Sequence, residues 1–73
     1  MERGLEASVT ASLYIVAKSG AEWIVIDNHV IQGSYPGRQL AIDAAEAGAR
    51  ANVPSELFIR AGEGLPEEQR FFS

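Results

Sequence analysis

His29 is the single histidine of this 73-residue chain and the first residue to consider for chemistry. It follows Asp27 and Asn28, and an aspartate so close to a histidine could serve as an acid–base pair. Catalysis would also need a nucleophile and an orienting group, and metal binding normally takes three or four ligands. No recognised spacing supplies them. We therefore interpret His29 as an exposed turn residue and expect no catalytic residue, no metal and no cofactor.

Two short motifs near the C-terminal end look like binding sequences but have simpler explanations. Gly62-Glu63-Gly64 is like part of a phosphate-binding glycine loop, yet it follows a predicted strand and precedes no helix, so we predict a hairpin turn. Glu67 and Glu68 could hold a cation, but adjacent residues of a strand point to opposite faces. The sequence therefore predicts a surface role for this acidic pair.

Aromatic side chains suggest another chemistry, the stacking of single-stranded nucleic-acid bases with basic residues on the phosphates. The residues available for it are Tyr14, Trp23, Phe58, Phe71 and Phe72, with Lys18, Arg60 and Arg70. A net charge of −4, with no cluster of Lys or Arg, opposes phosphate binding. Core packing or a dimer contact explains the same aromatics, so a nucleic-acid-associated domain remains an alternative that the charge disfavours.

Composition indicates one small folded domain that gains from a partner. The hydrophobic fraction of 47% and charged fraction of 22% are typical of globular proteins. A domain of this length buries only about three fifths of the surface that its unfolded chain exposes. Without cysteine there is no disulfide to compensate, which leaves oligomerisation. No run approaches the roughly 20 apolar residues of a membrane span, and residues 1–6 lack a secretory pattern, so we expect a cytoplasmic protein.

The remaining pattern predicts a flexible N-terminal segment, residues 1–11, and a single α+β domain, residues 12–73. In that domain one helix packs on a small antiparallel sheet, in the order β-β-(β)-α-β-(β). The predicted strands are residues 13–18, 23–26, 30–32, 56–60 and 69–72, and the helix runs from about Gly37 to Asn52.

The predicted helix has one polar face and one face of small residues, at 100° per residue. The polar residues are Gln39, Asp43, Glu46 and Arg50, and the small residues expected on the sheet are Gly37, Ala41, Ala44, Gly48 and Ala51. Such a helix approaches the sheet closely, so large strand side chains must supply the volume of the core. We expect Trp23 among them, with Leu40 and Ile42 on the flanks of the helix.

The chain resembles a bacterial family of small uncharacterised domains, known as the domain of unknown function 2188 family. The resemblance covers roughly residues 14–64. It is carried by Trp23-Ile24-Val25 at the end of the hairpin, by the Ala41, Ala45 and Gly48 spacing, and by Leu57-Phe58-Ile59 before a glycine turn. It implies the fold and no activity. It also implies that Trp23 and Val25 lie under the helix.

The hairpin strands are apolar on both faces, whereas an antiparallel sheet with one wet face alternates apolar and polar residues. One helix covers one face, so the sequence predicts a partner on the other. With Trp23 and Val25 under the helix, as the resemblance implies, the expected interface residues are Leu13, Ile15, Ile24, Ile26, Phe71 and Phe72. A register slip of one residue would exchange the two faces. The interpretation is a non-enzymatic interaction domain that self-associates as a homodimer or binds an unidentified protein. A small ligand-binding protein or enzyme with its site near His29 is a further alternative.

Overall fold

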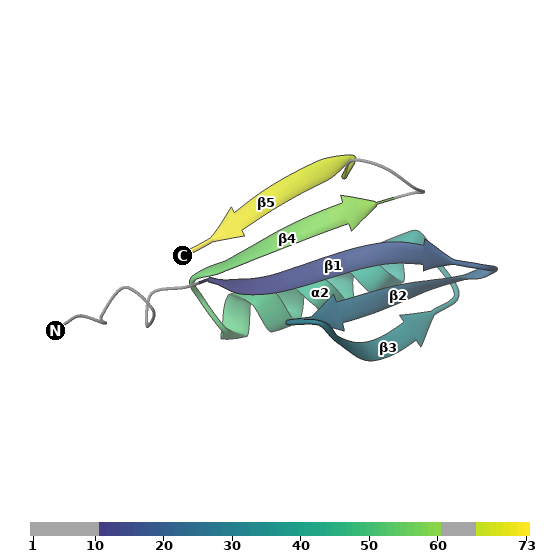
Figure 1. Ribbon diagram of the computed structural model, residues 1–73, viewed down its shortest axis with the longest axis horizontal. Coiled ribbons are helices and arrows are strands. Elements are labelled where there is room, and N and C mark those ends of the chain that lie inside the picture. Colours follow the sequence, from purple (N-terminus) through teal and green to yellow (C-terminus); the bar gives the residue numbers. More distant parts are fainter. Residues whose placement is uncertain (1–10, 61–65) are drawn as a thin grey trace, which may run out of the picture.

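The computed structural model describes residues 11–60 and 66–73 of the chain. Among these residues, one helix lies on one face of a five-stranded sheet, the α+β arrangement that the sequence predicts (Figure 1). The elements are β1 (Ser12–Ser19), β2 (Glu22–Asp27), β3 (Val30–Tyr35), α2 (Arg38–Ala51), β4 (Ser55–Arg60) and β5 (Glu68–Phe72). The predicted turn at residues 62–64 and most of the predicted N-terminal segment, residues 1–10, lie outside the described residues.

The sheet order is β3-β2-β1-β4-β5, with β1 in the centre. Neighbouring strands pair antiparallel except β1 and β4, which are parallel. Figure 1 shows the reason: α2 returns the chain along the sheet, so β4 begins beside the start of β1 and runs the same way. A backbone hydrogen bond of 3.0 Å from Ser12 N–H to the Pro54 carbonyl fixes this joint. The predicted antiparallel sheet is therefore mostly, though not wholly, antiparallel.

Both hairpins of the β1-β2-β3 meander use two-residue turns with positive φ. Gly20 has a φ of +63° in the first turn, while Asn28 and His29 have φ values of +49° and +75° in the second. The second turn, with positive φ at both central residues, has the pattern of a type I′ turn, whose twist suits antiparallel strands. Asn28 also holds the start of β1, because its Oδ1 accepts from Leu13 N–H at 2.9 Å and its own N–H donates to the Leu13 carbonyl at 2.8 Å.

The third strand is longer than the predicted residues 30–32. It passes a register shift opposite Val25 and Ile26 and continues to Tyr35. The Tyr35 side chain packs against the core, which keeps the chain extended until Pro36. The pattern of residues 33–35 alone does not show this, because glycine and serine are poor strand formers.

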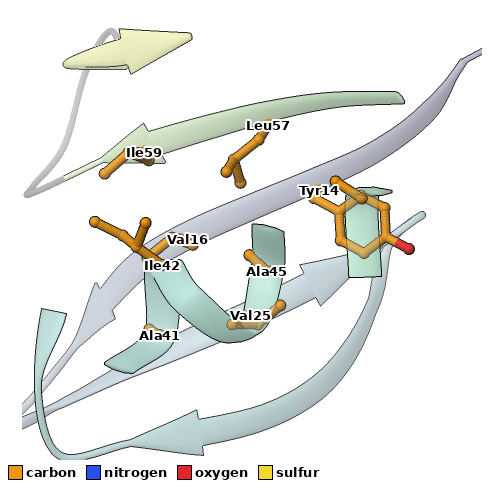
Figure 2. Packing of buried hydrophobic residues seen from close by; sticks show 9 residues of the cluster. Tyr14, Val16, Val25, Ala41, Ile42, Ala45, Leu57 and Ile59 are labelled. Carbon is orange, nitrogen blue, oxygen red and sulfur yellow. The ribbon is translucent and has the colours of Figure 1, made fainter. Parts of the chain in front are cut away.

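The core lies between α2 and the sheet (Figure 2). Its strand side chains are Tyr14, Val16, Val25, Leu57 and Ile59, each no more than 3% exposed. Trp23 packs against this cluster at its edge and is half-buried. Large strand residues thus supply the volume under a helix of small residues, as predicted.

The predicted orientation of α2 is right for Ala41, Ala44 and Gly48, which lie toward the core or Tyr14. The buried face is nevertheless rotated from the predicted one toward Ile42, by less than the roughly 100° of one residue. The residues buried on the sheet are Ala41, Ile42, Ala45 and Ala49. Leu40, predicted to flank the core, is 55% exposed. The physical reason is that alanines surround this helix on several sides, so Ile42 sets the orientation because it buries far more apolar area than an alanine. The same rotation moves Glu46 from the solvent face to the flank.

The end of α2 is held by polar side chains that position β4. Ser55 is buried and its Oγ donates to the Ala49 carbonyl at 2.7 Å. Asn52 Nδ2 donates to the Gly48 carbonyl at 3.0 Å and to the Tyr14 hydroxyl at 2.8 Å. The bond to Gly48 satisfies a carbonyl that the last helical turn leaves unpaired, because the Asn52 N–H donates to the Ala49 carbonyl instead, at 3.2 Å. The side-chain bonds also place β1 against the end of the helix.

Candidate interaction surface

The sheet face away from α2, here called the open face, carries none of the described elements (Figure 1). Residues paired between neighbouring strands lie on the same face of a sheet. Ile26 pairs with Ile31 and with Ile15, and Ile15 pairs with Phe58. These four residues form a continuous apolar row across β3, β2, β1 and β4, here called the central row. Gln69 of β5 continues it at the edge.

One further row lies on each side of the central row. On one side, Ala17 pairs with Ile24 and Arg60, and Ile24 pairs with Ser34. On the other side, Glu56 lies between Leu13 and Phe71. The middle of the open face is therefore apolar, and polar or charged groups stand toward its margins.

Exposure distinguishes the two faces of the sheet. The strand residues of the core are at most 3% exposed, whereas Ile31 and Phe71 on the open face are 63% and 69% exposed. Leu13, Ile15, Ile24, Ile26 and Phe58 are intermediate, because each is covered in part by its neighbours. The open face is thus a contiguous apolar surface rather than a set of isolated side chains.

Four of the predicted interface residues, Leu13, Ile15, Ile24 and Ile26, lie together on the open face. Phe71 lies at its margin. Phe72 lies on the helix side instead, where the Arg50 guanidinium stands over its ring at 5.1 Å. Their role as an interface stays a prediction.

Sequence reasoning missed Ile31 and Phe58 as members of this surface. Phe58 is the centre of an alternating strand, with Leu57 and Ile59 pointing to the core, and that alternation could have revealed it. Ile31 is harder to place, because the register shift beside Ile26 changes which residues of β3 point to which face.

His29 is exposed at the second position of the β2–β3 turn. Asn28 beside it is engaged with the backbone of Leu13. Within residues 11–60 and 66–73, no group of three His, Asp or Glu side chains is arranged to hold a metal ion. The geometry around His29 is that of a turn.

The aromatic residues do not form one stacking platform. Tyr14 is buried, and Trp23 and Phe72 pack against the core on the helix side. Phe58 and Phe71 lie on the open face. The distribution over two faces offers no single track for a nucleic-acid strand.

Arg70 joins β5 to the helix through Glu46 and also pairs with Glu68 of its own strand. Its guanidinium bonds to the carboxylates of both glutamates. The bond from Arg70 lowers the pKa of the exposed Glu68 below its ordinary value, and the pKa of Arg70 is raised in turn, chiefly by the same bond. Arg38 lies 3.3 Å from Glu67. The two adjacent glutamates are therefore paired with arginines, which fits the predicted surface role.

A shallow hollow of about 440 Å³ opens at the end of β5. Its lining includes Arg50, Val53, Phe71 and Phe72. The hollow is open to solvent and Arg50 is the one charged side chain among its lining residues, so it offers no set of converging polar side chains of the kind that orients a small ligand.

No helix among the described residues is long and apolar enough to cross a membrane. The resemblance to the domain of unknown function 2188 family stays a prediction, because the chain matches no protein-family model, no curated protein and no solved structure.

Proposed function

We propose that this chain is a non-enzymatic interaction domain that associates with a second copy of itself through the open face. The observation that carries the proposal is the central row, Ile31, Ile26, Ile15 and Phe58, which crosses four strands without a polar residue. In a sheet with one solvent-exposed face, apolar and polar residues alternate along each strand, so polar residues would be expected at these positions.

A partner on the open face would add stability that a small domain lacks. Moving an aliphatic or aromatic side chain from full exposure to full burial is worth about 1.5–3 kcal/mol. Ile31 and Phe71, more than half exposed, would gain most of that, and the inner residues would gain a smaller part. Because a whole domain is stable by only about 5–15 kcal/mol, several such gains are large on that scale.

The test is the molar mass in solution, measured by light scattering on a sizing column over a hundredfold dilution. We expect twice the chain mass of 7.9 kDa at high concentration. Ile15→Thr keeps a β-branched side chain while placing a hydroxyl in the central row, so it should shift the protein toward the monomer.

The control is Leu40→Thr, which changes an exposed apolar residue on the outer side of α2. It should leave the molar mass unchanged. The proposal fails if the unmodified chain has the monomer mass at every concentration. In that case the open face is not covered by a second copy of the chain. The proposal also fails if both variants lower the molar mass equally.

A further inference from the structure

Two side chains of opposite charge flank the central row on the same strand. Glu56 and Arg60 lie on the open face with Phe58 between them, because Ser55, Leu57 and Ile59 point to the core. Four residues of a strand span about 13 Å. Glu56 stands one row to one side of the central row and Arg60 one row to the other. The open face therefore carries Arg60 on one side of the central row and Glu56 on the other, and a half-turn about this row would exchange their positions.

We propose that two copies pair face to face about a two-fold axis that runs along the central row, so that Glu56 of each copy meets Arg60 of the other. The proposal rests on the self-association proposed above and specifies its geometry. Rotation about this axis stacks each strand on its own counterpart in the opposite direction. Phe58 then faces the second copy's Phe58, and Ala17 faces the second copy's Leu13, a small residue against a large one.

The spacing between two stacked sheets allows the proposed ion pairs between Glu56 and Arg60. Two stacked sheets lie about 10 Å apart. Arg and Glu side chains that point toward each other across this gap are together long enough to bridge it. Each pair would form twice in the dimer, as in any interface in which the same patch meets itself. The β1–β2 hairpin also places a charged residue, Glu22, on the open face. Glu22 pairs with Ser19 at the tip of this hairpin, outside the three rows described above.

Other two-fold axes fit the charges less well. An axis along β4 would stack Glu56 on the second copy's Glu56 and Arg60 on its Arg60, and opposed like charges cost several kcal/mol. An axis along β1 would stack β4 on the second copy's β2 and set Arg60 against Ile24. Of the three, the axis along the central row pairs opposite charges.

The first test exchanges the charges. Glu56→Arg and Arg60→Glu should each raise the dimer dissociation constant about tenfold or more, because each single variant puts like charges opposite one another. The double variant should return to within about threefold of the unmodified protein. An equimolar mixture of the two single variants should form a mixed dimer that is tighter than either variant alone. A mixture no tighter than its components would overturn the proposed axis.

A second test does not depend on how well Arg60→Glu folds. The chain has no cysteine, so a single introduced thiol reacts alone. Gln69 lies at the edge of the central row, and the axis brings it opposite the second copy's Gln69. Gln69→Cys should therefore cross-link to a covalent dimer with a short bismaleimide. Glu22→Cys, at the hairpin tip, should not, because the axis separates the two tips by about 27 Å.

The two proposals fail in distinguishable ways. If the protein dimerises and Ile15→Thr dissociates it, but Glu22→Cys cross-links and Gln69→Cys does not, the open face is the interface and the proposed axis is wrong. If the unmodified chain is a monomer throughout, self-association itself is wrong and the axis with it. Cross-linking at Gln69 together with recovery in the double charge variant would support both.

Discussion

Replacing Gly48 with alanine tests how closely α2 approaches the sheet. A Cβ at this position would lie 2.9 Å from Tyr14 Cε2 and 3.3 Å from the Tyr14 hydroxyl oxygen. The ring cannot move away freely, because it is buried and its hydroxyl accepts a hydrogen bond from Asn52 at 2.8 Å. The close approach of helix and strand at this point therefore requires glycine.

Three contributions set the expected change in the free energy of unfolding, one stabilising and two destabilising. Alanine in place of glycine within an exposed helix would stabilise by about 1 kcal/mol. Overpacking of the ring costs about 1–3 kcal/mol, and a displaced Asn52–Tyr14 hydrogen bond costs about 1 kcal/mol more. The net expectation for Gly48→Ala is a loss of about 1–3 kcal/mol, or a fall in Tm of roughly 4–24 °C for a domain of this size.

Thermal unfolding followed by circular dichroism, at one fixed protein concentration, measures this change without a contribution from altered association. The control is the same substitution in a Tyr14→Leu background, where the ring that the new methyl group would meet is gone. There Gly48→Ala should be neutral or stabilising by up to about 1 kcal/mol. An increase in Tm for Gly48→Ala in the unmodified protein would refute the close approach of Tyr14 to the helix.

Two further predictions concern the β2–β3 turn and the β5 ion pair. His29→Gly should stabilise the domain by up to about 1 kcal/mol in urea unfolding, because glycine adopts the positive φ of +75° without the steric penalty of a side chain; a clear loss of stability would contradict the turn assignment. The pKa of Glu68 is lowered in the folded state, so its pairing with Arg70 contributes stability above the ordinary value of 4.5 that is lost as the pH falls through the lower folded value. Unfolding midpoints measured from neutral pH to pH 3 should therefore decline less steeply below 4.5 for Glu68→Gln than for the unmodified protein, and an identical decline would count against this pairing in solution.

Local patterns in the sequence were enough to predict most of the elements. The β1–β2 hairpin follows from consecutive β-branched and aromatic residues around Gly20, and α2 begins and ends within one residue of the predicted bounds. These features depend on neighbours along the chain, such as strand propensity and turn residues. The apolar character of both hairpin faces is also visible in the sequence, and the second covering surface that it predicts stays a prediction.

The open face was only partly predictable, because its membership depends on which residues lie side by side across strands. Leu13, Ile15, Ile24 and Ile26 come from one hairpin whose two-residue turn sets the register. Phe58 joins them through the parallel pairing of β1 with β4, and its partner strand lies some 40 residues away in sequence. Nothing local to residues 55–60 identifies that neighbour.

The sequence by itself determined where this chain forms strands, turns and a helix, because those preferences act between residues a few positions apart. Only the tertiary structure decided the orientation of α2, the parallel β1–β4 pair, and the faces taken by Glu46 and Phe72. Each of these is chosen by how much side-chain volume and charge can be matched between distant segments. Alanines on several sides of α2 permit more than one orientation, and the burial of Ile42 selects one.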